Sequence, residues 1–132
     1  MNLHQRRMIL LKKCLIRKLQ KQKPQNILDV ATGTADLAIA MMKIKPFNVV
    51  GIDISNGMLE VGRKKIKQQD LEKTIQLQQA DSEDLPFEDA TFDAVTVSFG
   101  ARNFENLQKG LSEMARVLKP GGKIVIDVYS KN

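Results

Sequence analysis

Short apolar runs alternate along this chain with longer stretches in which apolar residues recur every three or four positions. The short runs predict strands, and the longer periodic stretches predict amphipathic helices. Strands are predicted at 27–30, 48–54, 75–80, 92–99 and 123–129, and helices at 3–22, 37–43, 56–69 and 106–119. Because helix and strand alternate, the pattern predicts an α/β domain with a parallel sheet and right-handed crossovers.

A turn of small residues joins the first strand to the helix that follows it. Ala31, Gly33 and Ala35 would let backbone N–H groups approach a ligand closely at a helix N-terminus. The spacing nearly matches the dinucleotide-binding fingerprint, but Asp36 replaces its third glycine and Asp29 precedes the turn. Both carboxylates would repel a pyrophosphate and suit the sulfonium and amino group of S-adenosylmethionine. Close packing alone would also favour small residues here, so the turn by itself leaves both explanations open.

Polar residues follow the second and third predicted strands. Asp53 lies 20 residues beyond Gly33, where a carboxylate of a βαβ unit can accept both ribose hydroxyls of an adenosine. An acid at a strand end could instead cap the next helix, but Ser55 can fill that role. Asp81 and Ser82 follow the third strand, where a polar acceptor could meet an adenine amino group; the same residue types are also common in turns.

The composition is that of one globular domain spanning residues 1–132, with 42% hydrophobic residues. No apolar run approaches the roughly 18 residues that a membrane span requires, and the first residues lack the apolar core of a signal peptide. The single cysteine, Cys14, cannot form an internal disulfide, which is typical of a reducing compartment. A cytoplasmic location is therefore expected.

The positive charge is concentrated at the N-terminus. The net charge is +6, and residues 1–23 contain eight Lys or Arg residues and no acid. A basic helix of this kind could contact an anionic membrane surface or could simply present a solvated face. Aromatic residues make up only 5% of the chain and none lies in this helix, so nucleic-acid binding is disfavoured.

Several motifs together resemble, in order and spacing, the ubiquinone/menaquinone biosynthesis C-methyltransferases. The Leu-Pro-Phe and Lys-Pro-Gly-Gly elements are common among class I methyltransferases, whereas Ser-Phe-Gly-x-Arg-Asn is more particular to the quinone enzymes. The resemblance covers residues 27–130 and implies a Rossmann-like three-layer sandwich with strand order 3-2-1-4-5. The matching stretches are Asp29-Val-Ala-Thr-Gly-Thr-Ala-Asp36, Gly51-Ile-Asp-Ile-Ser55, Met58-Leu-Glu-Val-Gly-Arg63, Leu85-Pro-Phe87, Ser98-Phe-Gly-Ala-Arg-Asn103 and Arg116-Val-Leu-Lys-Pro-Gly-Gly122.

The resemblance implies S-adenosylmethionine as cofactor, S-adenosylhomocysteine as product and a demethylmenaquinol or ubiquinol precursor as substrate, with no metal. It implies cofactor contacts at Thr34, Asp53, Asp81, Ser82 and Ser98. With the first turn and the second strand end included, the expected cofactor-binding residues are Asp29, Ala31, Thr32, Gly33, Thr34, Asp53, Ile54, Asp81, Ser82 and Ser98. Arg102 and Asn103 are the hypothesised catalytic residues, which would orient a ring oxygen and stabilise negative charge on it; alternatively, Arg102 only ties down its loop.

Three departures from the family pattern stand out. Ala31 and Ala35 replace glycines, and Asp127-Val128 stands where the family has an apolar residue followed by Glu. The chain also begins after the family's N-terminal signature and stops before the last two strands of the full sheet, so it is expected to be a fragment. Its fifth strand would then be an uncovered edge through which copies could self-associate.

Two other classes of function remain open from the sequence. An NAD(P)-dependent oxidoreductase would share the strand-turn-helix pattern, although Asp29 and Asp36 disfavour it. A cofactor-binding fragment without turnover would share every binding feature and lack only the wall around the acceptor.

Overall fold

A five-stranded sheet forms the centre of the computed structural model, which describes residues 16, 17, 19–21, 23–97 and 105–126. The strands are β1 (Asn26–Val30), β2 (Asn48–Asp53), β3 (Ile75–Gln79), β4 (Phe92–Val97) and β5 (Leu118–Ile126). They lie in the order β3-β2-β1-β4-β5, and every pair is parallel. The predicted α/β class and strand order are confirmed.

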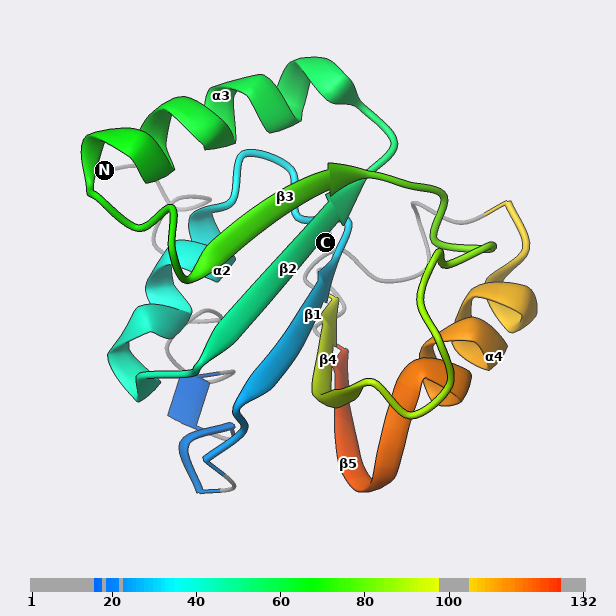
Figure 1. The fold of residues 1–132 in the computed structure, drawn as a ribbon. Helices are drawn as coiled ribbons and strands as arrows, with labels where there is room; N and C mark the ends of the chain where they lie inside the picture. Colours follow the sequence, from blue (N-terminus) through cyan, green and yellow to red (C-terminus); the bar gives the residue numbers. More distant parts are fainter. Residues whose placement is uncertain (1–15, 18, 22, 98–104, 127–132) are drawn as a thin grey trace, which may run out of the picture.

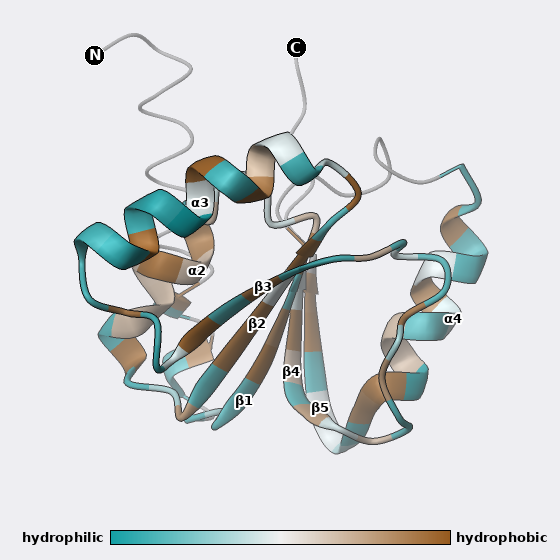
Figure 2. Cartoon of the chain, turned by 45° about the horizontal axis from the view of Figure 1, so that its top comes forward, coloured by the Kyte–Doolittle hydropathy of each residue, from teal (hydrophilic) through white to brown (hydrophobic). Residues whose placement is uncertain are grey.

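Helices cover both faces of this sheet (Figures 1 and 2). Helix α2 (Asp36–Ala40), the 3-10 helix η1 (Met41–Ile44) and helix α3 (Asn56–Gln68) lie on one face, and α4 (Leu107–Val117) lies on the other. Successive strand residues point to opposite faces of the sheet. Ile27 therefore packs in the core cluster under α2 and α3, and Leu28 packs in the cluster under α4. The result is the expected three-layer sandwich.

The N-terminal helix is described only in part. Residues 16, 17, 19 and 20 are helical, and both Ile16 and Leu19 are buried in the core cluster beneath α2. These two apolar positions belong to the stripe that the sequence predicts for 3–22. Residues 1–15 lie outside the described part of the chain.

Two predicted element ends are wrong. The helix predicted to reach Lys119 ends at Val117, and β5 begins at once with Leu118. Lys119 precedes Pro120, and a residue before proline disfavours the helical conformation. Gly121 then adopts a φ of 84° in the turn, which glycine does readily. The register between β4 and β5 shifts there, because Phe92 pairs with Leu118 and Ala94 already pairs with Lys123.

The edges of the sheet, as far as the structure describes it, are β3 and β5. The strand order that the resemblance implies places the third strand at an edge, and this is confirmed for β3. Self-association through β5 stays a prediction. A single monomeric species in concentrated sedimentation runs would contradict it. None of the described helices is long and apolar enough to cross a membrane.

The pH dependence of stability should depend in part on Asp93, at the start of β4. Burial raises the pKa of this carboxyl, but hydrogen bonds donated by the Asn26 and Gln25 amides (2.8 and 3.0 Å) and the Lys119 ammonium outweigh it, so its pKa lies below the usual value. A lowered folded-state pKa stabilises the protein above the unfolded value and loses that effect as the carboxyl protonates. Urea unfolding should therefore show stability falling below about pH 4, with a shallower fall in Asp93→Asn. Identical pH profiles for the two proteins would contradict this role.

Candidate cofactor site

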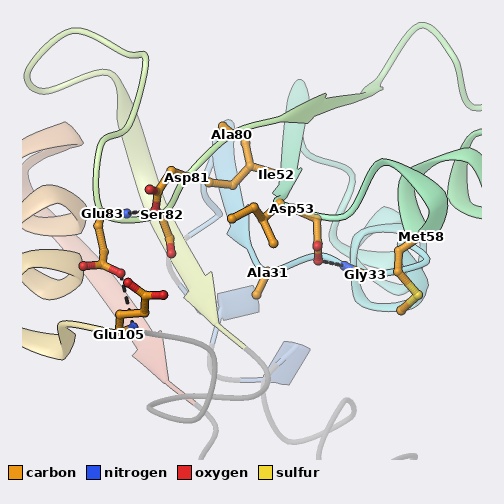
Figure 3. A pocket seen from close by; sticks show the side chains of 11 residues that line it. Ala31, Gly33, Ile52, Asp53, Met58, Ala80, Asp81, Ser82, Glu83 and Glu105 are labelled. Atoms are coloured by element: carbon orange, nitrogen blue, oxygen red, sulfur yellow. Dashed lines mark hydrogen bonds between the residues drawn. The ribbon is translucent and has the colours of Figure 1, made fainter.

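The ends of β1, β2 and β3 meet around one pocket at the carboxyl edge of the sheet (Figure 3). Its volume is about 530 Å³, within the usual range for small-molecule sites. Parallel strands place their carboxyl ends at one edge, which is where open α/β sheets bind ligands. The pocket is lined by Ala31, Gly33, Ile52, Asp53, Ile54, Met58, Ala80, Asp81, Ser82, Glu83 and Glu105.

The Asp53 carboxylate faces the small-residue turn directly. Its Oδ2 accepts a hydrogen bond from the Gly33 amide at 2.8 Å, and its Oδ1 accepts one from the Ser55 amide at 2.9 Å. Ser55 also caps α3, since its hydroxyl accepts from the Met58 amide at 3.3 Å, as predicted. Asp53 is therefore fixed in place by two amides, and each oxygen retains a further lone pair for a ligand hydroxyl.

The turn between β1 and α2 carries unusual backbone strain. Ala31, Gly33 and Ala35 have φ values of 58°, 60° and 70°, in the left-handed region that glycine adopts freely and alanine does not. The alternating small residues thus match an alternating left-handed backbone. The two alanines at family glycine positions cost conformational energy, which the sequence alone does not show.

Ala31→Gly should raise the free energy of unfolding by about 0.5 kcal/mol, because relief of left-handed strain exceeds the greater flexibility of glycine in the unfolded chain. Ala38→Gly is the matched control, since Ala38 is a buried residue inside α2. That substitution should cost at least about 1 kcal/mol. Chemical denaturation of both variants tests the difference. Equal destabilisation by the two changes would contradict the strain.

Three predicted binding residues do not line the pocket. Asp29 is fully buried, and its two oxygens accept hydrogen bonds from the hydroxyls of Thr32 (2.8 Å) and Thr96 (2.6 Å). The Thr34 hydroxyl accepts from the Lys65 ammonium at 3.0 Å. None of Asp29, Thr32 and Thr34 lines the pocket, whereas the predicted residues Ala31, Gly33, Asp53, Ile54, Asp81 and Ser82 do.

The charge of this pocket distinguishes it from a pyrophosphate site. The acids responsible are not Asp29 and Asp36, which the sequence suggested. Asp36 forms an ion pair with Lys65 at 2.8 Å, and Asp29 is buried, so neither faces the pocket. The lining carries the four acids Asp53, Asp81, Glu83 and Glu105 and, among described residues, no Lys, Arg or His. A lining of this charge attracts a cation and repels phosphates.

Five lining residues escape prediction from sequence. Ile54 and Met58 are 72% and 45% exposed, and both present apolar surface at the pocket, but only Ile54 was expected. Met58 lies beside Gly33 in the pocket wall, with its Cε 3.5 Å from where a Gly33 Cβ would lie (Figure 3). Its place in the Met58-Leu-Glu-Val-Gly-Arg63 motif was the available clue. The residues missed are Ile52, Met58, Ala80, Glu83 and Glu105.

The remaining predicted residues, Ser98, Arg102 and Asn103, lie outside the described residues. Within the ranges that are described, no group of three or more His, Cys, Asp or Glu side chains could hold a metal ion.

A parallel sheet in the order 3-2-1-4-5 has a Rossmann-like topology, and the similar solved structures show that it is the fold of class I S-adenosylmethionine-dependent methyltransferases. Within that class, the chain belongs to the ubiE/COQ5 methyltransferase family, whose model matches residues 1–132.

Individual relatives agree with this assignment. The chain is 54% identical over 105 residues to a demethylmenaquinone methyltransferase of Bacteroides fragilis, covering 79% of this chain and 43% of the relative. It is 50% identical over 106 residues to a ubiquinone/menaquinone biosynthesis C-methyltransferase of Geobacter sp. M21, covering 79% and 45%. The crystal structure of the PH0226 protein from Pyrococcus horikoshii OT3 superposes with a TM-score of 0.80 at 31% identity, covering 95% of this chain and 58% of that one. The chain thus spans a little under half the length of these two curated relatives.

Proposed function

We propose that this chain supplies the S-adenosylmethionine site of a C-methyltransferase that acts on a demethylmenaquinol or ubiquinol precursor in quinone biosynthesis. The observation that carries the proposal is the Asp53 carboxylate, held at the mouth of the small-residue turn by the Gly33 amide. Membership of the ubiE/COQ5 family and the names of the relatives support the choice of reaction and substrate class.

In this proposal each strand end binds one part of the cofactor. Asp53 accepts the ribose hydroxyls, and Asp81 and Ser82 meet the polar edge of the adenine. Ile54 and Met58 supply the apolar surface on which the adenine ring packs. The turn at Ala31 and Gly33 lies against the amino-acid end, and the acidic lining suits its positive charges.

When bound, S-adenosylmethionine would supply an electrophilic methyl group for in-line attack by a carbon of the quinol ring, with S-adenosylhomocysteine as the leaving group and a proton lost from that ring carbon afterwards. The protein's task is therefore to align the two molecules and to exclude water. Arg102 and Asn103 are proposed to orient the ring oxygen and to stabilise negative charge on it as electron density rises at the attacking carbon. This part of the proposal rests on the family resemblance.

Calorimetric titration with S-adenosylhomocysteine and with NADH tests the cofactor assignment. The acidic lining predicts binding of S-adenosylhomocysteine and none of NADH, whose pyrophosphate would face the lining carboxylates. Binding of NADH alone would overturn the proposal. Transfer of a labelled methyl group to demethylmenaquinol then separates an active enzyme from a cofactor-binding fragment, because the fragment binds S-adenosylhomocysteine without turnover.

A further inference from the structure

The connection from β3 to β4 is a crossover without a helix. Residues 80–91 return from the carboxyl edge of the sheet to its opposite edge beside α4, and they contain only turns, bends and one isolated bridge between Asp81 and Asp84 (Figure 1). A helix would satisfy its own backbone N–H and C=O groups, but an irregular segment needs partners from elsewhere. Its first residues, Ala80 to Glu83, line the cofactor pocket.

One ion pair on α4 supplies those partners. The Arg116 guanidinium donates to the carbonyls of Leu85 and Phe87 at 3.0 and 2.8 Å. It also donates to Asp89 Oδ1 at 2.8 Å and to both oxygens of Glu113 at 2.7 and 3.2 Å. Glu113 Oε1 in turn accepts from the Leu85 amide at 2.8 Å. The planar fork of arginine can serve all these acceptors together, and a lysine ammonium cannot.

The far end of the crossover is tied to the same helix end. The amides of Ala90 and Thr91 donate to the carbonyls of Arg116 and Val117 at 2.9 and 2.8 Å, which satisfies two carbonyls at the end of α4. The Leu85 side chain is buried in the core below α4. The segment is thus anchored from Leu85 onward, and the pocket-lining residues 81–83 extend from that anchor.

We propose that Arg116, held by Glu113, is a positioning residue for cofactor selectivity: by anchoring the crossover at Leu85 and Phe87 it fixes Asp81 and Ser82 against the adenine. This inference rests on the proposed function, because it takes the ligand to be an adenosine. Arg116 itself is not among the residues that line the pocket, so it acts only through the crossover.

The test compares S-adenosylhomocysteine with S-inosylhomocysteine, in which the 6-amino donor of the purine becomes a carbonyl acceptor and the N1 acceptor becomes an N–H donor. The wild-type chain should prefer the adenosyl ligand by at least about tenfold in Kd, since a hydrogen bond to a carboxylate is lost in the inosyl ligand. Arg116→Met should weaken the adenosyl ligand by about tenfold and the inosyl ligand much less, so that the preference falls toward unity. Arg116→Lys should restore only part of it.

Lys119→Met is the matched control. Lys119 lies three residues after Arg116 and pairs with Asp93, so this change removes an ion pair that does not involve the crossover. It should leave both Kd values unchanged. Circular dichroism at the titration temperature checks that each variant is folded. If Arg116→Met does not fold, Glu113→Gln takes its place in the comparison. Folded variants that keep the full adenosyl preference would overturn the inference alone. A wild-type chain that binds both ligands without preference would likewise overturn the inference alone, whereas one that binds neither ligand would overturn the proposed function with it.

Discussion

Asp53→Ala is expected to weaken S-adenosylhomocysteine binding by about 100-fold or more. The carboxylate is the group proposed to accept both ribose hydroxyls, and hydrogen bonds to a charged acceptor contribute about 1.5–3 kcal/mol each. The change also leaves the Gly33 and Ser55 amides without their acceptor, so the free energy of unfolding should fall by about 1–2 kcal/mol. Calorimetry and urea denaturation measure the two effects separately.

Asp53→Asn and Glu60→Gln separate charge from shape. The asparagine keeps one acceptor oxygen and should give an intermediate loss of affinity. Glu60 lies on the exposed face of α3 and pairs with Arg63, away from the pocket lining, so Glu60→Gln should bind as the wild type does. An Asp53→Ala variant with unchanged affinity would show that the ribose lies elsewhere.

Gly62→Val should be the most damaging substitution in α3, lowering the free energy of unfolding by about 3 kcal/mol or more. A Cβ at Gly62 would lie 2.9 Å from Leu77 Cδ1, 3.2 Å from Ala35 Cβ and 3.2 Å from the Thr34 carbonyl carbon. The last of these contacts is backbone of the turn between β1 and α2, so a side chain would push α3 off the turn. Affinity for S-adenosylhomocysteine should fall together with stability.

Gly57 provides the control within the same helix. A Cβ there would meet only Ser55 Oγ, at 3.9 Å, so Gly57→Ala should be neutral or should stabilise α3 by up to about 1 kcal/mol through better helix propensity. Thermal unfolding of Gly57→Ala, Gly62→Ala and Gly62→Val gives the comparison. Equal stability of all three would mean that α3 does not pack on the turn as closely as the structure shows.

Much of the fold could be predicted because it follows from local patterns. The apolar periodicity and the Ser55 cap each act within a few positions, and the order of the strands follows from the family resemblance. The 20-residue spacing of Gly33 and Asp53 likewise predicted that the carboxylate stands at the end of the second strand beside the turn, and the structure adds its hydrogen bond with the Gly33 amide.

The parts that escaped prediction depend on contacts between distant segments. Nothing local to Asp29 shows that Thr96, on β4, would take up one of its oxygens and bury it. The pairing of Lys65 with Thr34 and Asp36 depends on the direction in which α3 crosses the turn. Arg116 was visible only as part of a motif, because its partners are backbone carbonyls about 30 residues earlier in the chain.

The convergence of three strand ends on one adenosine is tested most directly by a crystal structure of this chain with S-adenosylhomocysteine. The ribose hydroxyls should lie within hydrogen-bonding distance of Asp53, with the adenine between Ile54 and Met58 and its amino group toward Asp81. An adenosine bound away from the ends of β1, β2 and β3, with Asp53 contacting only Gly33 and Ser55, would contradict the assignment.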